Sequence, residues 1–147
     1  MLLLGLKNAT TQDVVVDGIV NIGNSYRKYD KKNKCGVFAF NRTANDVTLQ
    51  QKGVYHVTAT FVASAPAAGD VTVQLLVNGV AVPGALATET ITTATTEFRT
   101  MVIDYYVLVD QDCILGNEST VAQTISFQNT GVAATFTSVV VNVSKEV

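Results

Sequence analysis

Apolar and polar residues alternate with a period of two along most of this chain, as they do in β-strands that bury one face. The clearest case is segment 53–63, which places Tyr55, Val57, Ala59 and Phe61 on a single face. That face is therefore predicted to lie in the core. No segment keeps apolar residues at a 3.6-residue spacing over three turns, so the sequence predicts strands and no helix.

Turn signals separate the predicted strands. Asp17-Gly18 and Asn78-Gly79 supply the positive φ angles that a two-residue hairpin turn needs. The first pair predicts a hairpin over residues 13–22, and the second predicts a hairpin that joins strand 70–77 to strand 80–82. Residues 24–35 are polar and charged and are predicted to form a loop. The other predicted strands cover 37–40, 47–49, 86–91, 97–109, 121–128 and 134–143.

Segment 97–109 is apolar on both of its faces, and a strand of this kind must be covered on both sides. A sandwich of 147 residues has only one core to offer. The second face is therefore predicted to pack on neighbouring subunits of a cyclic homotrimer. The candidate residues for this shared interface are Tyr106, Phe127 and Phe136.

Composition supports an all-β fold with a single core. The 147 residues include 24 Val and 19 Thr, which favour pleated, half-buried strands. Only 15% of the residues are charged and 48% are hydrophobic, which excludes a disordered chain. About eight strands at this spacing indicate a two-sheet sandwich or a jelly roll.

The chain offers little material for catalysis. His56 is the only histidine, and no Ser or Cys stands in a nucleophile-elbow context, so His56 is predicted to form surface or interface hydrogen bonds. Asp104 interrupts an apolar strand and must either face solvent or pair with a nearby Arg or Lys, for which Arg99 is a candidate if the chain geometry permits. Cys35 and Cys113 are either two free thiols or one bridge. We therefore predict no enzymatic activity, no metal and no cofactor.

Charged residues are distributed unevenly along the chain. Residues 1–34 hold six basic and three acidic residues, a net charge of +3, which leaves −5 for the rest of a chain whose total is −2. The basic candidates for docking on a partner are Arg27, Lys28, Lys31, Lys32 and Lys34. With the apolar start of the chain, they predict an attachment arm over residues 1–35, followed by a jelly-roll domain over 36–147. The other interpretation is that the arm folds back and adds a strand to its own sandwich.

Two further classes of partner are disfavoured. The apolar segment 1–6 has no basic flank and no cleavage pattern, so it predicts neither a signal peptide nor a membrane span. The basic loop with its interleaved tyrosines is a weak match to nucleic-acid binding, and a solvated or protein-docking face is the favoured interpretation. No nucleic-acid partner is predicted.

Residues 36–147 resemble the trimeric jelly-roll superfamily of tumour necrosis factor and the complement-type globular head, in particular its bacterial and phage branch. The matching segments, in order, are Gly53-Val54-Tyr55, the small-residue turn 65–69, the strand and turn 71–79, Val82-Pro83-Gly84 and the closing strand 135–143. Two departures stand out: no collagen-like stalk precedes residue 36, and the final strand lacks the usual Phe-x-Gly-Phe ending.

The resemblance implies an all-β, TNF-like jelly-roll sandwich that assembles as a homotrimer. Because a basic loop stands where a stalk would be, it also implies a structural virion protein of a tailed phage, a capsid decoration or head-fibre protein on the capsid surface. Its partner would be the major capsid protein or another virion protein. The alternative is a receptor- or glycan-binding jelly-roll module of a phage fibre or bacterial surface protein, whose partner would be a host-surface glycan.

Overall fold

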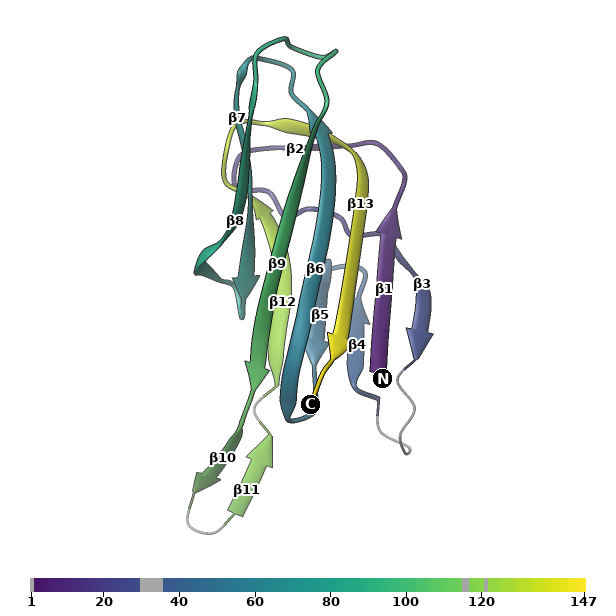
Figure 1. Cartoon of the computed structure of the whole chain (residues 1–147), viewed down its shortest axis with the longest axis vertical. Helices are drawn as coiled ribbons and strands as arrows, with labels where there is room; N and C mark the ends of the chain where they lie inside the picture. Colours follow the sequence, from purple (N-terminus) through teal and green to yellow (C-terminus); the bar gives the residue numbers. More distant parts are fainter. Residues whose placement is uncertain (1, 30–35, 115–116, 121) are drawn as a thin grey trace.

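Two antiparallel β-sheets pack face to face and form a jelly-roll sandwich (Figure 1). The computed structural model describes residues 2–29, 36–114, 117–120 and 122–147. The first sheet has the order β3 (Asn24–Tyr29), β1 (Leu2–Asn8), β13 (Ala134–Lys145), β6 (Gly53–Ser64) and β9 (Arg99–Val109), and β2 (Gln12–Val14) pairs with the far end of β13. The second sheet has the order β4 (Phe38–Asn41), β5 (Asp46–Leu49), β12 (Gln123–Asn129), β7 (Gly69–Val77) and β8 (Val80–Ile91). The predicted all-β jelly roll is confirmed.

A small hairpin extends from one end of the sandwich. It consists of β10 (Gln111–Ile114) and β11 (Asn117–Thr120), which pair only with each other in the described residues (Figure 1). The sequence pattern did not predict these two strands. Within the same described ranges the chain forms no helix, and so none that is long and apolar enough to span a bilayer.

The core lies between the two sheets, where the inward-facing positions of both are buried. Tyr55, Val57, Ala59 and Phe61, the predicted inner face of segment 53–63, are fully buried. The ring of Phe61 on the first sheet meets the ring of Phe127 on the second at 5.2 Å between centroids, in an edge-to-face arrangement. Side chains that alternate along each strand therefore join the two layers into one core.

The N-terminal segment is an integral part of this sandwich, which corrects the predicted attachment arm. β1 lies within the first sheet and pairs with β13 from Leu2↔Lys145 to Asn8↔Val139. Its side chains Leu4 and Leu6 are buried in the shared core. A boundary at residue 35 therefore does not separate two structural units, and the arm follows the other interpretation, in which it folds back on its own sandwich. The physical reason is that the apolar start of the chain buries its side chains without a partner.

The predicted hairpin over residues 13–22 is wrong. Residues 12–14 pair with β13 in the first sheet, whereas Ile19 forms a bridge with Gln128 in the second. The Asp17-Gly18 turn exists, with a φ of 64° at Asp17, but it links the two sheets instead of two neighbouring strands. The sequence predicted a turn here, although only Asp17 of the two residues has a positive φ. It did not predict the pairing partners, because they come from the other end of the chain.

A buried amide holds this crossing segment in place. Asn129 is fully buried, and its side-chain nitrogen donates to the backbone carbonyls of Val14 at 3.2 Å and Val132 at 2.9 Å. Its backbone N–H also donates to the carbonyl of Gly18 at 2.9 Å. Because each buried polar group has a partner, this network secures residues 14–18 against the C-terminal half of the chain.

Two other sequence predictions have different outcomes. The Asn78-Gly79 hairpin is confirmed, with φ angles of 52° and 76° at the two turn residues and β7 paired with β8. Residues 24–29 were predicted to be loop but form the edge strand β3, all of whose residues are exposed. Polar and charged residues suit an exposed edge strand, since they discourage pairing with other chains.

Glu97 organises the loop between β8 and β9. One of its carboxylate oxygens accepts hydrogen bonds from the backbone N–H groups of Thr92 at 2.6 Å and Thr93 at 2.8 Å. The other oxygen accepts two from the guanidinium group of Arg99, the shorter at 2.6 Å. The backbone hydrogen bond from Thr93, followed by those from Thr92 and Arg99, lowers the pKa of Glu97 from 4.5 to about 2.

We expect this loop to loosen in acid well below the usual range for a glutamate. The folded pKa of Glu97 is depressed, so the contribution of the carboxylate is present above pH 4.5 and is lost as the pH falls toward about 2. In an NMR titration, the amide shifts of Thr92 and Thr93 should move with a midpoint near pH 2, and in Glu97→Gln they should not titrate. A midpoint near 4.5 in the unmodified protein contradicts the prediction.

Candidate functional site

The outward face of the first sheet carries an exposed apolar row along β9. Val102, Tyr106 and Leu108 all point away from the core, and between 54% and 60% of each side chain is exposed. We call these three residues the β9 apolar row. Their neighbours on β6 are Thr60, His56 and Val54 respectively. The edge strand β9 thus leaves three apolar side chains in contact with solvent, and Asp104 lies on the same face between Val102 and Tyr106.

A cluster of polar residues adjoins this row and orients Tyr106. The ring of His56 stacks on that of Tyr106 with 4.6 Å between centroids, and its Nε2 atom lies 2.5 Å from the Oδ1 atom of Asp104. The Nδ1 atom of His56 lies 4.0 Å from a carboxylate oxygen of Glu146. The predicted hydrogen-bonding role of His56 is confirmed. The predicted partner of Asp104 is wrong: Arg99 pairs with Glu97, which is two residues away along the same stretch of chain.

This cluster does not activate a hydroxyl as a nucleophile. Thr58 Oγ1 is the hydroxyl recorded near the imidazole, and it lies 3.5 Å from Nε2, the same nitrogen that contacts Asp104. A nucleophile relay needs the hydroxyl on one ring nitrogen and the carboxylate on the other. The geometry therefore positions His56 and Tyr106 as surface groups. Within the described residues, no three His, Cys, Asp or Glu side chains cluster as metal ligands would.

The outward face of the second sheet has a different character. Its threonine hydroxyls hydrogen-bond one another across neighbouring strands, at 2.8 Å between Thr72 and Thr88 and at 3.1 Å between Thr48 and Thr124. Thr90 donates to Asp70 at 2.7 Å on the same face. Paired hydroxyls on a pleated surface are well suited to water. The two outward faces therefore differ: the second sheet has paired threonine hydroxyls, and the first sheet has three exposed apolar side chains on one strand.

Two of the three predicted interface residues lie elsewhere. Phe127 and Phe136 are fully buried in the core of the sandwich, where both pack against Phe61. They cannot contact a neighbouring subunit, which corrects the prediction for both. Tyr106 does reach the surface, with 59% of its side chain exposed. Val102 and Leu108 were missed as interface candidates, although the two-sided apolar pattern of segment 97–109 could have identified them.

The basic candidates lie at the edge of the first sheet. Arg27 and Lys28 are exposed on β3. Tyr26 anchors this strand, because its hydroxyl donates to the side-chain oxygen of Asn142 at 2.6 Å and its ring lies over Gly5. The structure thus presents these two cations on a strand of the sandwich and not on a free arm. Lys31, Lys32, Lys34 and Cys35 lie outside the described residues, so neither their role nor a bridge to Cys113 is tested.

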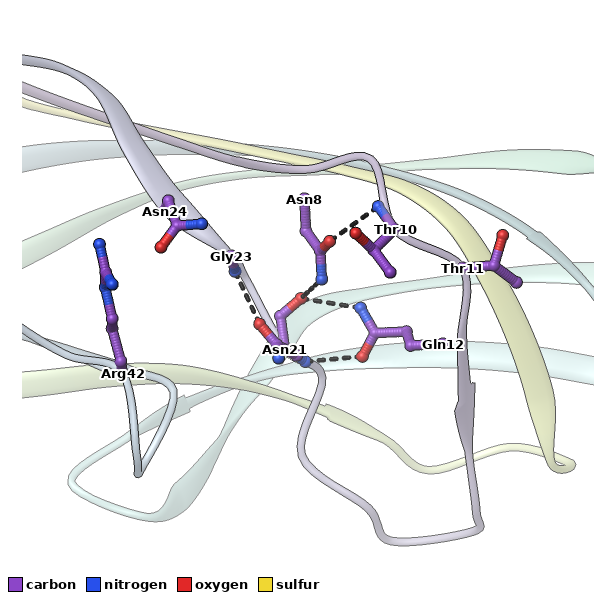
Figure 2. A pocket seen from close by; sticks show the side chains of 8 residues that line it. All are labelled: Asn8, Thr10, Thr11, Gln12, Asn21, Gly23, Asn24 and Arg42. Atoms are coloured by element: carbon purple, nitrogen blue, oxygen red, sulfur yellow. Dashed lines mark hydrogen bonds between the residues drawn. The ribbon is translucent and has the colours of Figure 1, made fainter.

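A pocket of about 420 Å³ lined by polar residues opens where residues 8–12 and 21–24 meet Arg42, in the turn after β4, and the sequence pattern did not predict it (Figure 2). Its walls come from the ends of β1 and β3, the segment around β2 and the turn after β4. The lining residues are Asn8, Thr10, Thr11, Gln12, Asn21, Gly23, Asn24 and Arg42. Scattered Asn, Gln and Thr residues have no periodic signal, and only the fold brings residues 8–24 beside residue 42.

No family model and no curated protein matches the sequence of this chain. Solved structures do match its fold. The globular domain of zebrafish complement 1qA protein aligns with a TM-score of 0.66 at 7% identity, over 100% of this chain and 98% of the other. Eiger TNF from S. frugiperda aligns with a TM-score of 0.69 at 10% identity, over 99% and 91%. Murine APRIL at pH 5.0 aligns with a TM-score of 0.57 at 9% identity, over 97% and 98%. The chain has the jelly-roll fold that these TNF-like and C1q-like domains share.

Proposed function

We propose that this protein is a self-associating structural jelly roll, a homotrimer whose subunits meet through the outward face of the first sheet. The observation that carries the proposal is the β9 apolar row, Val102, Tyr106 and Leu108, three exposed apolar side chains on one strand of the first sheet. Contact with a second copy would remove these side chains from water, at about 25 cal/mol for each Å² of apolar surface buried. The threonine-paired face of the second sheet would remain in solvent.

The polar residues beside the row suit an interface between subunits. The stacked rings of His56 and Tyr106 and the contact with Asp104 hold the tyrosine in a defined orientation before association. A preorganised aromatic side chain loses little conformational entropy when it is buried. Tyrosine is also among the residues that most often carry binding energy at interfaces. Three copies follow from the sequence resemblance to trimeric jelly rolls, in which one contact between neighbouring subunits is repeated around a three-fold axis.

Sedimentation equilibrium tests this proposal with a matched pair of variants. The unmodified protein should sediment at about 47 kDa, three times its chain mass of 15.6 kDa. Leu108→Glu places a charge in the row and should give a monomer, because an unpaired charge in an interface costs several kcal/mol. The control is Leu86→Glu, which changes a leucine with 47% exposure on the opposite sheet and should remain trimeric.

A compact monomer at micromolar concentration for the unmodified protein contradicts the proposal. A stable dimer would overturn the proposed trimer. If Leu108→Glu abolished that dimer, the result would still support association through this face. Loss of assembly in both leucine variants also contradicts the proposal, because the second sheet would then contribute equally.

For the role of the assembly, we propose decoration of a tailed-phage capsid, a proposal supported by the sequence resemblance. Arg27 and Lys28 on β3 would meet an acidic surface of the major capsid protein or of another virion protein. The protein should co-sediment with capsids of the phage that encodes it. The double variant Arg27→Glu/Lys28→Glu should weaken this binding at least tenfold and leave the trimer intact. Equal binding by the double variant would contradict the docking role of β3. We propose no enzymatic activity for this assembly.

A further inference from the structure

We infer that the pocket formed by residues 8–12, residues 21–24 and Arg42 binds a carboxylate-bearing sugar, such as the acidic residue at the end of a surface glycan. This site is separate from the proposed trimer surface and does not depend on it. The inference rests on three properties of the pocket: a polar floor held by its own hydrogen bonds, several hydrogen-bond donors that have no partner among the described residues, and a lining without carboxylates.

The floor of the pocket is held in shape by its own hydrogen bonds (Figure 2). The side-chain amide of Gln12 donates to the carbonyl of Asn21 at 2.8 Å and accepts from its N–H at 2.9 Å. Asn8 donates to the same carbonyl at 3.0 Å and accepts from the N–H of Thr10 at 2.9 Å. The Asn21 side chain accepts from the N–H of Gly23 at 2.8 Å. These amides are already oriented, so a ligand would not need to order them.

Gly23 lets two chain segments approach closely at this floor. Its φ is +79°, and a Cβ atom built there would lie 2.0 Å from the carbonyl oxygen of Lys7. No larger residue fits between the segments without moving the backbone. The pocket wall is therefore set by backbone geometry as well as by side chains.

Several donors of the lining have no hydrogen-bond or ion-pair partner in the described part of the chain. They are the guanidinium group of Arg42, the amide of Asn24, the side-chain nitrogen of Asn21 and the hydroxyls of Thr10 and Thr11. Figure 2 shows Arg42 and Asn24 at the end of the pocket opposite Gln12. A cation and amide at one end and hydroxyls at the other would suit a ligand with a negative group and several hydroxyls.

The chemistry of the lining selects among ligands. An acidic sugar would place its carboxylate against the planar fork of Arg42, which can donate two parallel hydrogen bonds. Its hydroxyls would meet Asn24, Asn21 and the threonines. The lining offers no carboxylate to repel the ligand and no aromatic ring on which a neutral sugar face would stack. A volume of about 420 Å³ falls within the range of small-ligand pockets.

Ligand-observed NMR and calorimetry on the full chain would test the site with four probes: N-acetylneuraminic acid, glucuronic acid, glucose and inorganic sulfate. We expect at least one sugar acid to bind, with millimolar affinity and at least tenfold more tightly than glucose or sulfate. Arg42→Ala should weaken that binding at least tenfold. Lys52→Ala is the matched control, because it removes an exposed cation outside the pocket, and it should bind as the unmodified protein does.

Each outcome decides the inference. Preference for a sugar acid, lost in Arg42→Ala and retained in Lys52→Ala, supports it, and the two acids distinguish sialic-type from uronic-type ligands. If sulfate binds as tightly as either sugar acid, the site binds an adventitious ion only, and the inference is overturned. Glucose binding equally well, no binding by any probe, or binding unchanged in Arg42→Ala also overturns it. The variants' thermal unfolding should match that of the unmodified protein, since Arg42 is exposed.

Discussion

Deleting residues 1–29 should prevent the rest of the chain from folding. The deletion removes β1, β2 and β3 and exposes the long edge of β13, which β1 covers over seven residue pairs. It also removes Leu4, Leu6, Val20 and Ile22 from the core, each at most 1% exposed. Losing any one such side chain typically costs 2–5 kcal/mol, and a whole domain is stable by only about 5–15 kcal/mol. We therefore expect an insoluble or unfolded product, measured by circular dichroism and solubility after expression.

The control for this truncation keeps the strand and changes its charges. The double variant Arg27→Gln/Lys28→Gln should fold and unfold cooperatively like the unmodified protein, because both side chains are exposed. If residues 30–147 alone gave a soluble protein with a cooperative melting transition, the first 29 residues would be an independent attachment arm after all.

Phe127→Ala should destabilise the sandwich by about 3–5 kcal/mol. The ring of Phe127 is fully buried between the sheets and contacts Phe61 edge to face, so truncation removes contacts from both layers and leaves a cavity. Chemical denaturation at a single protein concentration would measure the change in the free energy of unfolding, since association shifts apparent stability.

Phe98→Ala provides the matched control for the core variant. Phe98 lies beside the β8–β9 loop with 53% of its side chain exposed, so its truncation should change the unfolding free energy by less than about 1 kcal/mol. Equal losses in the two variants would show that Phe127 does not carry the packing between the sheets.

Local patterns predicted the central strands well and the pairing of the ends poorly. Segment 53–63 alternates strictly, and its register follows from the requirement that Tyr55 and Phe61 face inward. The hairpin turn at residues 78–79 requires positive φ angles, and the pair Asn78-Gly79 identifies such a turn from the sequence alone. Asp17-Gly18 gives the same local signal, yet its flanking residues pair with β13 and β12, more than 100 residues away in sequence. Such pairings depend on tertiary packing, which a short stretch of sequence does not reveal.

The candidate surface shows the same limit at the level of side chains. The two-sided apolar pattern of β9 predicted that one face would need a cover, and it identified Tyr106. Phe127 and Phe136 are aromatic like Tyr106, and aromatic character alone does not distinguish a core residue from an interface residue. The pocket could not be predicted at all, because Arg42, in the turn after β4, comes next to residues 8–24 only in the folded chain.

The pairing of β1 with β13 brings the two ends of the chain together. Leu2 lies opposite Lys145 at the end of the sandwich where both termini emerge (Figure 1). A short glycine-rich linker could join them without disturbing any strand. The Asn78-Gly79 turn would then serve as the new start and end of the chain, because it is exposed and a Cβ at Gly79 would meet nothing within 4 Å. The fold is thus suited to circular permutation, which would move a fused tag or cargo from one pole of the sandwich to the β7–β8 turn.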